Sequence, residues 1–284
     1  MMEHAVVIGG GTMGAGIAFA LARSGIETEL VEVSEELSQA GIRHASEMID
    51  EGVVRGRLTA GDAEASKQRL SARVGIEAAT AHPRVVIEAV PERIELKREV
   101  LASAESLGAA LLASNTSGIP IGQLAEALQD PTRFLGLHFF NPVPAMALVE
   151  VVLGEATSEE AAKAATDLVA EIGKEAIPVG DSPGFASTRL GLVLGLEAIR
   201  MVEAGVAEPA DVDRAMVLGY RHPVGPLRLT DIVGLDIRLD IARNLQAAYG
   251  ERFAPPPLLE RMVSKGQLGK KSGRGFFEWG LRAN

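Results

Sequence analysis

The chain contains no cysteine, one tryptophan and two tyrosines, and it has fewer basic than acidic residues. Without cysteine, disulfide bonds, thiolate metal sites and cysteine nucleophiles are excluded. The formal net charge of −10 opposes broad binding to nucleic acids or anionic lipids, because those partners require an extended basic surface. The absence of cysteine also fits a reducing cytosol, so we expect a cytoplasmic protein that binds neither nucleic acid nor membrane.

Long apolar runs are also missing. None approaches the length of about 18 residues that a membrane-spanning helix requires. The N-terminus has no basic region followed by a long apolar stretch, so we expect no secretory signal. Hydrophobic residues make up 47% of the 284 residues, which is enough to fill a large core and, at this length, about two domains.

Short β-branched apolar runs alternate with longer amphipathic stretches from Met1 to about Asp181, a pattern typical of βαβ units around a parallel sheet. The expected strands are His4–Ile8, Glu27–Val31, Val85–Val90, Leu111–Ser114, Phe134–His138, Leu148–Val152 and Ala176–Val179. The expected helices are Met13–Ser24, Glu35–Val53, Glu92–Leu107, Ile121–Leu128 and Glu159–Ile172. After Pro183-Gly184 the pattern becomes helical with no convincing strand, which indicates a domain boundary.

A glycine pattern follows the first expected strand directly. The segment Gly9-Gly10-Gly11-Thr12-Met13-Gly14 leads into a helical stretch. In a dinucleotide-binding unit, Gly9 would permit the tight turn, Gly11 would let the backbone approach a pyrophosphate, and Gly14 would allow close helix packing. The helix N-terminus would face the negative charge. An ordinary glycine-rich turn is the alternative, but the strand that follows the helix favours a dinucleotide site.

These features predict an α/β fold in which an N-terminal Rossmann-type dinucleotide-binding domain, residues 1–183, is followed by an all-helical C-terminal domain, residues 184–284. The second expected strand runs into Glu32, eighteen residues after Gly14. A carboxylate there can accept hydrogen bonds from the ribose hydroxyls and would repel a 2′-phosphate. We therefore expect NAD as the cofactor, with a solvated strand-end charge as the alternative for Glu32.

A histidine and an acid lie on either side of a proline-rich turn. His138 ends one expected strand, and Glu150 lies within the next. Imidazole can accept a hydroxyl proton near neutral pH, and a carboxylate can fix its tautomer and stabilise its protonated form. Each residue alone is more often structural, but together with a dinucleotide site they favour a proton relay, because hydride transfer from an alcohol also needs a base.

Ser117 lies after a third expected strand, where it could cap the following helix or point into the active crevice. A metal site is not expected, because the remaining histidines show no ligand spacing. These histidines are His4, His44, His82 and His222.

Taken together, the motifs resemble those of the 3-hydroxyacyl-CoA dehydrogenase family, short monofunctional type. The N-terminal motifs are Gly9–Gly14, Glu88-Ala89-Val90-Pro91-Glu92, Ser114–Ser117 and His138-Phe139-Phe140-Asn141-Pro142. The C-terminal motifs are Asp181-Ser182-Pro183-Gly184-Phe185, His222-Pro223-Val224-Gly225-Pro226, Asp231–Asp236 and Gly269–Phe276. The resemblance covers nearly the whole chain and implies NAD-dependent, reversible oxidation of an L-3-hydroxyacyl-CoA, 3-hydroxybutyryl-CoA in particular.

The resemblance also implies roles for individual residues. His138 would be the catalytic base, Glu150 its supporting carboxylate, and Ser117 a hydrogen-bond partner near the substrate oxygen and the nicotinamide. Asn141 matches a position that contacts both cofactor and substrate. The other expected cofactor contacts are Gly9, Gly11, Thr12, Met13, Gly14, Glu32, Glu92 and Lys97.

One residue departs from the family pattern. Thr188 stands where the family usually has an asparagine that binds the substrate, so a hydroxyl replaces an amide. This substitution keeps open a sugar-acid dehydrogenase that resembles L-gulonate 3-dehydrogenase. A third hypothesis is a non-catalytic dinucleotide-binding or structural protein.

Two further expectations concern partners. Arg43, Arg55 and Arg57 lie on or after one expected helix and could meet the CoA phosphates, but a solvated helix face is as good an interpretation. Family members dimerise through the helical domain, so a homodimer is expected. An apolar stripe suits either a dimer face or the domain core, and it consists of Leu190, Val193, Leu194, Ile199 and Val202.

Overall fold

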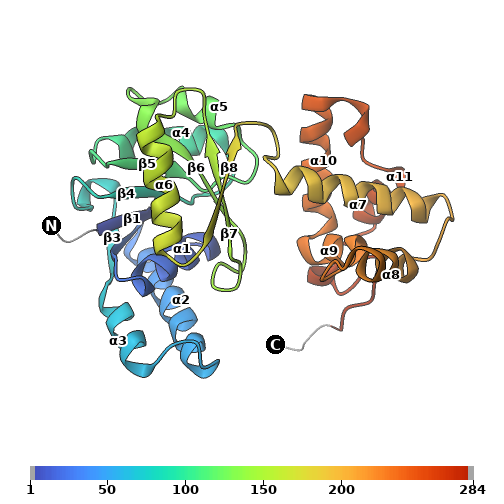
Figure 1. The fold of residues 1–284 in the computed structure, drawn as a ribbon, viewed down its shortest axis with the longest axis horizontal. Coiled ribbons are helices and arrows are strands. Elements are labelled where there is room, and N and C mark those ends of the chain that lie inside the picture. Colours follow the sequence, from blue (N-terminus) through green and yellow to red (C-terminus); the bar gives the residue numbers. More distant parts are fainter. Residues whose placement is uncertain (1–3, 281–284) are drawn as a thin grey trace. The chain divides into compact units, whose positions relative to one another are not determined.

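The computed structural model describes residues 4–280. It divides into two compact units, and the division falls between Phe185 and Ala186 (Figure 1). The first unit holds all the named strands of the described residues, whereas the named elements of the second are helical. The structure therefore has the predicted order of an α/β unit followed by a helical unit.

The first unit is built on one eight-stranded sheet with the order β3-β2-β1-β4-β5-β6-β7-β8. The strands are β1 His4–Ile8, β2 Glu27–Glu32, β3 Leu70–Val74, β4 Val85–Glu88, β5 Leu111–Ser114, β6 Phe134–Phe139, β7 Leu148–Leu153 and β8 Glu175–Gly180. The chain leaves β1 toward β2 on one side and later returns to β4 on the other. The carboxyl ends of β1 and β4 are therefore adjacent, and this switch point is where open α/β sheets bind ligands.

The sequence pattern predicts a parallel sheet, but the sheet of the structure is mixed. Strands β1 to β6 are parallel to their neighbours, but β7 pairs antiparallel with β6, and β8 is parallel to β7. The connection from β6 to β7 covers only residues 140–147. Parallel pairing needs a crossover of about a dozen residues or more, so this short connection allows only an antiparallel return.

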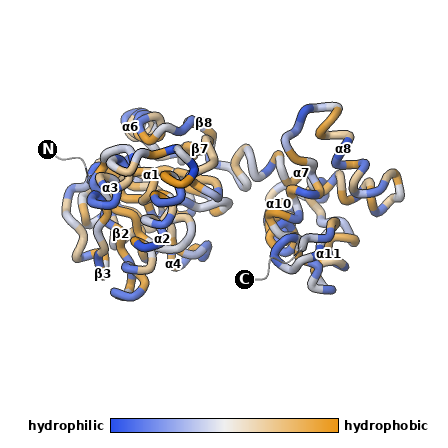
Figure 2. Tube along the Cα trace, turned by 90° about the horizontal axis from the view of Figure 1, so that it is seen from below, coloured by the Kyte–Doolittle hydropathy of each residue, from blue (hydrophilic) through white to orange (hydrophobic). Residues whose placement is uncertain are grey.

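Helices cover both faces of the sheet. They are α1 Thr12–Arg23, α2 Glu35–Val54, α3 Ala60–Gln68, α4 Ile94–Glu105, α5 Ile121–Ala125 and α6 Glu159–Glu171. One core joins one face to α1, α2, α3 and α6, and a second joins the other face to α4 and α5. The hydrophilic parts of the chain lie mainly at the periphery (Figure 2). Alternation along β6 turns Leu137 toward the first core and His138 toward the side of the second.

The second unit consists of helices around its own apolar core, which includes Leu192, Leu196, Leu235 and Phe253. The helices are α7 Ser187–Glu203, α8 Pro209–Tyr220, α9 Pro226–Val233, α10 Leu235–Tyr249 and α11 Pro257–Ser264. Pro209, Pro226 and Pro257 each occupy the first helical position, where a missing N–H is harmless. Within residues 4–280, no helix is long and apolar enough to cross a membrane.

Candidate active site

The turn between β1 and α1 depends on its glycines. Gly9 has φ +102°, and a Cβ there would lie 2.8 Å from the carbonyl oxygen of Ala89 at the end of β4. At Gly14 a Cβ would lie 1.7 Å from the carbonyl oxygen of Gly9, so only glycine lets the helix pack this closely. By contrast, nothing lies within 4 Å of a Cβ at Gly11. Gly11 thus leaves open space at the start of α1.

This turn fits a dinucleotide. No side chain caps the N-terminus of α1, so its first backbone N–H groups are free to bind an anion. Glu32 stands at the end of β2, and its carboxylate accepts hydrogen bonds from Gly10 N at 2.7 Å and Val33 N at 3.1 Å. The acid is therefore fixed beside the glycine turn. Thr12 is the exposed first residue of α1, and the side chain of Met13 packs against the sheet core.

His138 and Glu150 form a direct cross-strand pair of β6 and β7. His138 Nδ1 lies 2.8 Å from Glu150 Oε2. Both side chains are buried, Glu150 with an exposed fraction of only 1%. Glu150 therefore does not face solvent.

Aromatic rings enclose the imidazole. The ring of Phe140 lies 4.4 Å from that of His138 between centroids, and the ring of Phe185 lies 5.7 Å away. Phe185 itself is buried among the apolar side chains of this face. Because the carboxylate occupies Nδ1, a proton on Nδ1 leaves Nε2 as the acceptor nitrogen.

A network of polar side chains joins the ends of β4 and β5. Glu88 ends β4, and its carboxylate accepts hydrogen bonds from Lys97 Nζ, Ser114 Oγ and Val90 N at 2.6, 2.6 and 2.7 Å. Lys97 is 1% exposed and Glu88 is fully buried. Burial raises the pKa of Glu88, against the opposing effect of the Lys97 charge and the three hydrogen bonds.

The same network reaches Ser117 through Glu92. Lys97 Nζ lies 3.4 Å from Glu92 Oε2, and Glu92 Oε1 accepts hydrogen bonds from Ser117 N and Thr116 Oγ1 at 2.9 and 2.6 Å. Ser117 Oγ is 3.3 Å from the same oxygen. Ser117 does not cap α5, whose N-cap residue is Pro120. Of its two predicted roles, capping is therefore wrong. Sequence reasoning had also given no role to Glu88, although it is the first residue of the motif that ends with Glu92.

Asn115 and Asn141 lie near the end of β6. Asn115 Oδ1 accepts a hydrogen bond from Phe139 N at 3.0 Å, which ties the Ser117 segment to the strand that carries His138. Asn141 is exposed two residues after β6, and its peptide bond to Pro142 is cis. Asn141 and Thr12 line the same cavity, so the end of β6 lies near the start of α1.

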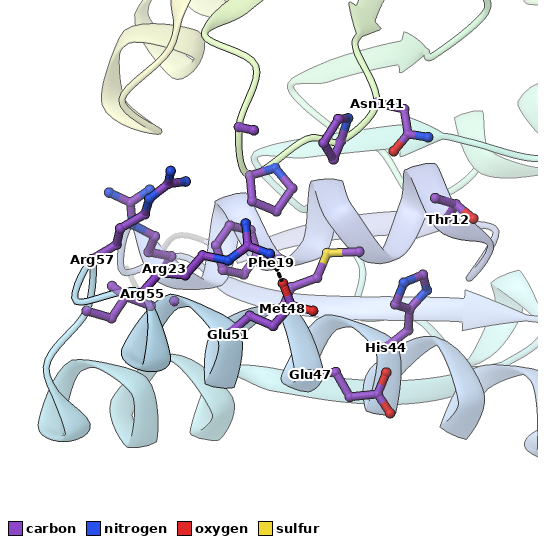
Figure 3. A pocket seen from close by; sticks show the side chains of 15 residues that line it. Thr12, Phe19, Arg23, His44, Glu47, Met48, Glu51, Arg55, Arg57 and Asn141 are labelled. Carbon is purple, nitrogen blue, oxygen red and sulfur yellow. Dashed lines mark hydrogen bonds and ion pairs between the residues drawn. The ribbon is translucent and has the colours of Figure 1, made fainter. Parts of the chain in front are cut away.

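This cavity has a volume of about 320 Å³ and is formed by α1, α2, the segment after α2 and the loop between β6 and β7. Arg23, Arg55 and Arg57 line one end, and His44 lies nearer Thr12 and Asn141 (Figure 3). Arg55 pairs with Glu51 at 2.7 Å. Arg43, the third arginine considered from the sequence, is not among the lining residues, whereas Arg23 was missed because it lies on a different helix.

Thr188 lies in the first turn of α7 and is half-buried within the second unit. All the other predicted site residues belong to the first unit. Among residues 4–280, no group of three or more His, Asp or Glu side chains is arranged to hold a metal ion.

Comparison with known proteins identifies the family. The model of the NAD binding domain of 3-hydroxyacyl-CoA dehydrogenase matches residues 4–182, and the model of the C-terminal domain of the same enzyme matches residues 184–279. The chain belongs to the 3-hydroxyacyl-CoA dehydrogenase family. The predicted family, the predicted fold class and NAD as the cofactor are thereby confirmed.

Similar proteins match nearly the whole length of this family member. A Bacillus subtilis protein named probable 3-hydroxybutyryl-CoA dehydrogenase is 40% identical over 98% of each chain. A Mycobacterium tuberculosis 3-hydroxybutyryl-CoA dehydrogenase is 42% identical over 98% of this chain and 99% of its own. The crystal structure of (S)-3-hydroxybutyryl-CoA dehydrogenase from Ralstonia eutropha matches with a TM-score of 0.93 and 35% identity, covering 98% and 99% of the two chains. The chain is thus an NAD-dependent oxidoreductase of this family.

Proposed function

We propose that this chain catalyses the reversible oxidation of L-3-hydroxybutyryl-CoA, or a close 3-hydroxyacyl-CoA, to the 3-ketoacyl-CoA with NAD as acceptor. The buried pair of His138 on β6 and Glu150 on β7 is the observation that carries the proposal. The relatives named 3-hydroxybutyryl-CoA dehydrogenase support the substrate.

NAD, when bound, supplies the acceptor carbon for the hydride that leaves C3 of the substrate. His138 Nε2 accepts the proton of the C3 hydroxyl as the carbonyl forms, and in the reverse direction it returns that proton. Glu150 holds the hydrogen on Nδ1 and stabilises the imidazolium that the proton transfer creates. The enclosing rings of Phe140 and Phe185 exclude water from this proton transfer.

The other residues hold and orient the reactants. Ser117 donates from its hydroxyl toward the substrate oxygen, while Glu92 fixes the Ser117 backbone. Asn141 contacts cofactor and substrate from the loop after β6. Thr188 supplies a hydroxyl where the family commonly has an amide. Around the cofactor, contacts come from Gly9, Gly11, Thr12, Met13, Gly14, Glu32, Glu92 and Lys97.

The CoA part of the substrate binds in the arginine-lined cavity. Arg23 and Arg57 appear in none of the ion pairs of residues 4–280, so their charges are available to the phosphates. Guanidinium groups suit phosphate because they present several N–H donors in one plane. The site takes this polyanion despite the net charge of −10, because the cationic end is local.

The functional unit is a homodimer that forms through α7. Leu190, Val193 and Leu194 are 66%, 42% and 42% exposed on this helix, whereas Ile199 is buried in the core of the second unit. The predicted stripe thus divides into a surface part and a core part. In sedimentation velocity, L190E/L194E should sediment as a monomer, whereas the matched variant L218E on α8 should remain dimeric. A monomeric wild type would reject the dimer.

The proposed dehydrogenase reaction is tested by following the absorbance of NADH over time at a saturating concentration of cofactor. The panel contains acetoacetyl-CoA, longer 3-ketoacyl-CoAs and L-gulonate with NAD. We expect turnover of acetoacetyl-CoA and a fall in kcat of about 10²–10⁴-fold in His138→Gln, because the general base is lost. His4→Gln is the control, since the His4 ring lies outside the proposed site, where its Nε2 is 3.3 Å from the Thr80 carbonyl oxygen.

Activity on L-gulonate alone would replace the proposed substrate by a sugar acid. Binding of NADH without turnover of any substrate would favour a non-catalytic protein. Unchanged kcat in His138→Gln would reject the proton relay.

A further inference from the structure

Lys174 lies in the turn between α6 and β8, far in sequence from the proposed active site, yet its side chain reaches the loop between β6 and β7. Its Nζ donates hydrogen bonds to the carbonyl oxygens of Val143 at 2.7 Å and Met146 at 2.6 Å. Lys174 also lines a smaller cavity of about 160 Å³, which shares Phe19 and Arg23 with the arginine-lined cavity. The ammonium group is therefore placed behind the loop that carries Asn141.

The loop has other fixed points as well, among them the hydrogen bond from Glu175 N to the Ala147 carbonyl oxygen at 2.8 Å. Its backbone forms a turn in which Ala145 N and Met146 N both donate to the carbonyl oxygen of Pro142, at 2.9 and 3.1 Å. The side chain of Val143 is 2% exposed and packs where α1 has Gly16, since a Cβ at Gly16 would lie 2.8 Å from a Val143 methyl group. Val143 thus anchors one side of the turn, and Lys174 holds the backbone from the other.

The contacts of Lys174 are unusual for a lysine. Among the ion pairs of residues 4–280, none includes Lys174, and its polar partners are two backbone carbonyls. Burial and the nearby charge of Arg23 lower the pKa of Lys174. Partial burial of an ammonium group without a carboxylate partner costs desolvation free energy. A lysine that faced solvent would not have this cost. The side chain is held at this position by the loop rather than by a charge partner.

We propose that Lys174 is a positioning residue that clamps the loop of residues 141–147 in the form that lines the cavity for the CoA part of the substrate. Pro144 and Ala145 of this loop line the cavity, as does Asn141. If the two carbonyls lose their common donor, the loop samples other conformations and the cavity wall is incomplete for part of the time. The inference rests on the proposed function for its kinetic readout.

The clamp predicts a specific kinetic signature. Lys174 Nζ contacts the carbonyl oxygens of Val143 and Met146, whereas most of the proposed cofactor contacts lie outside this loop, so the KM for NADH should rise less than threefold, through Asn141 alone. The KM for acetoacetyl-CoA should rise about tenfold in Lys174→Met, which corresponds to about 1.4 kcal/mol of binding free energy. For acetoacetyl-N-acetylcysteamine, which lacks most of the CoA moiety, the rise should be less than threefold. A side chain needed only for folding would not separate the two substrates.

The test compares Lys174→Met with Lys163→Met, a matched lysine on α6 whose ion pair with Asp167 is exposed. Hydrogen exchange by mass spectrometry on the free proteins provides a second readout that does not require activity. We expect faster exchange of peptides covering residues 141–147 in Lys174→Met only, because the amides of Ala145 and Met146 open more often.

The outcomes are distinguishable. An inactive wild type with acetoacetyl-CoA would overturn the proposed function, while the exchange experiment would still decide whether the loop is clamped. With an active wild type, an unchanged KM in Lys174→Met would overturn the clamp, as would an equal rise for both thioesters. Unchanged exchange of residues 141–147 would overturn it as well.

Discussion

The cross-strand pairing of His138 with Glu150 places two ionisable side chains on one face of β6 and β7 at 2.8 Å. Strand pairing places the two residues directly opposite each other, and the length of the side chains closes the remaining distance. The geometry should therefore survive a substitution that keeps the shape of the Glu150 side chain. Glu150→Gln keeps a carbonyl oxygen for Nδ1 but removes the charge that stabilises the imidazolium. We expect kcat for acetoacetyl-CoA to fall by about 10²-fold or more, with KM for NADH within twofold.

Steady-state kinetics of Glu150→Gln against Glu160→Gln would measure this effect, since Glu160 is an exposed residue of α6. Circular dichroism and the thermal midpoint would show whether the fold persists. A Glu150→Gln enzyme with wild-type kcat would mean that the carboxylate has no electrostatic part in the reaction.

Among single residues, the sequence identified polar residues in or at the end of apolar strands better than the residues that support them. His138, Glu150 and Glu32 could be selected because their position relative to an apolar run is visible in the sequence. Glu88 and Lys174 could not, because their importance depends on partners that only the fold brings near. Lys97 was selected by resemblance, yet its burial against Glu88 follows from the packing of α4 on the end of β4.

At the scale of secondary-structure elements, the β1–α1 turn contains two glycines, Gly11 and Gly14, that differ in the space available for a Cβ. Gly14→Ala should lower stability, because its Cβ would overlap the carbonyl oxygen of Gly9 at 1.7 Å. Overpacking of this kind costs about 1–3 kcal/mol, and each kcal/mol corresponds to roughly 2–4 °C in the thermal midpoint of a unit of this size. Gly11→Ala meets nothing within 4 Å, so the free protein should unfold at the wild-type temperature.

The same Gly11→Ala variant should bind NADH at least about tenfold more weakly, because its methyl group enters the space that the pyrophosphate needs. Fluorescence titration with NADH and differential scanning fluorimetry would separate the two effects. Wild-type NADH affinity in Gly11→Ala would show that the dinucleotide does not approach this turn.

Helices and strands with strong periodicity were predicted within one or two residues at most ends, such as β1, β5 and α6. The pattern failed for β3 and α3. Strand β3, Leu70–Val74, is an edge strand in which apolar and polar residues alternate and none is fully buried, so it lacks the continuous apolar run of β1 or β4. Helix α3, Ala60–Gln68, contains no residue more apolar than alanine and buries only Ala63 and Ser66, so its sequence shows no apolar stripe and indicates a loop as readily as a helix.

For the molecule as a whole, acidic residues dominate, yet the proposed substrate is a polyanion. Long-range repulsion from a net charge of −10 opposes binding, and a local group of arginines must overcome it. Arg57 is exposed at the cationic end of the cavity, and Arg43 is an arginine of α2 that is also exposed but lies outside the cavity. Arg57 and Arg43 carry the same charge and are both subject to the electrostatic field of the net negative protein. They differ in whether they line the cavity proposed for the phosphates.

Arg57→Gln should therefore raise the KM for acetoacetyl-CoA about threefold at low salt, because an exposed charge pair contributes up to about 1 kcal/mol. Arg43→Gln should change it by less than 1.5-fold, since at about 0.1 M salt the screening length is only about 10 Å. Raising the salt to about 0.5 M should increase the wild-type KM and remove most of the difference from Arg57→Gln. Equal effects of the two substitutions would mean that net charge, and not the cavity, governs substrate binding.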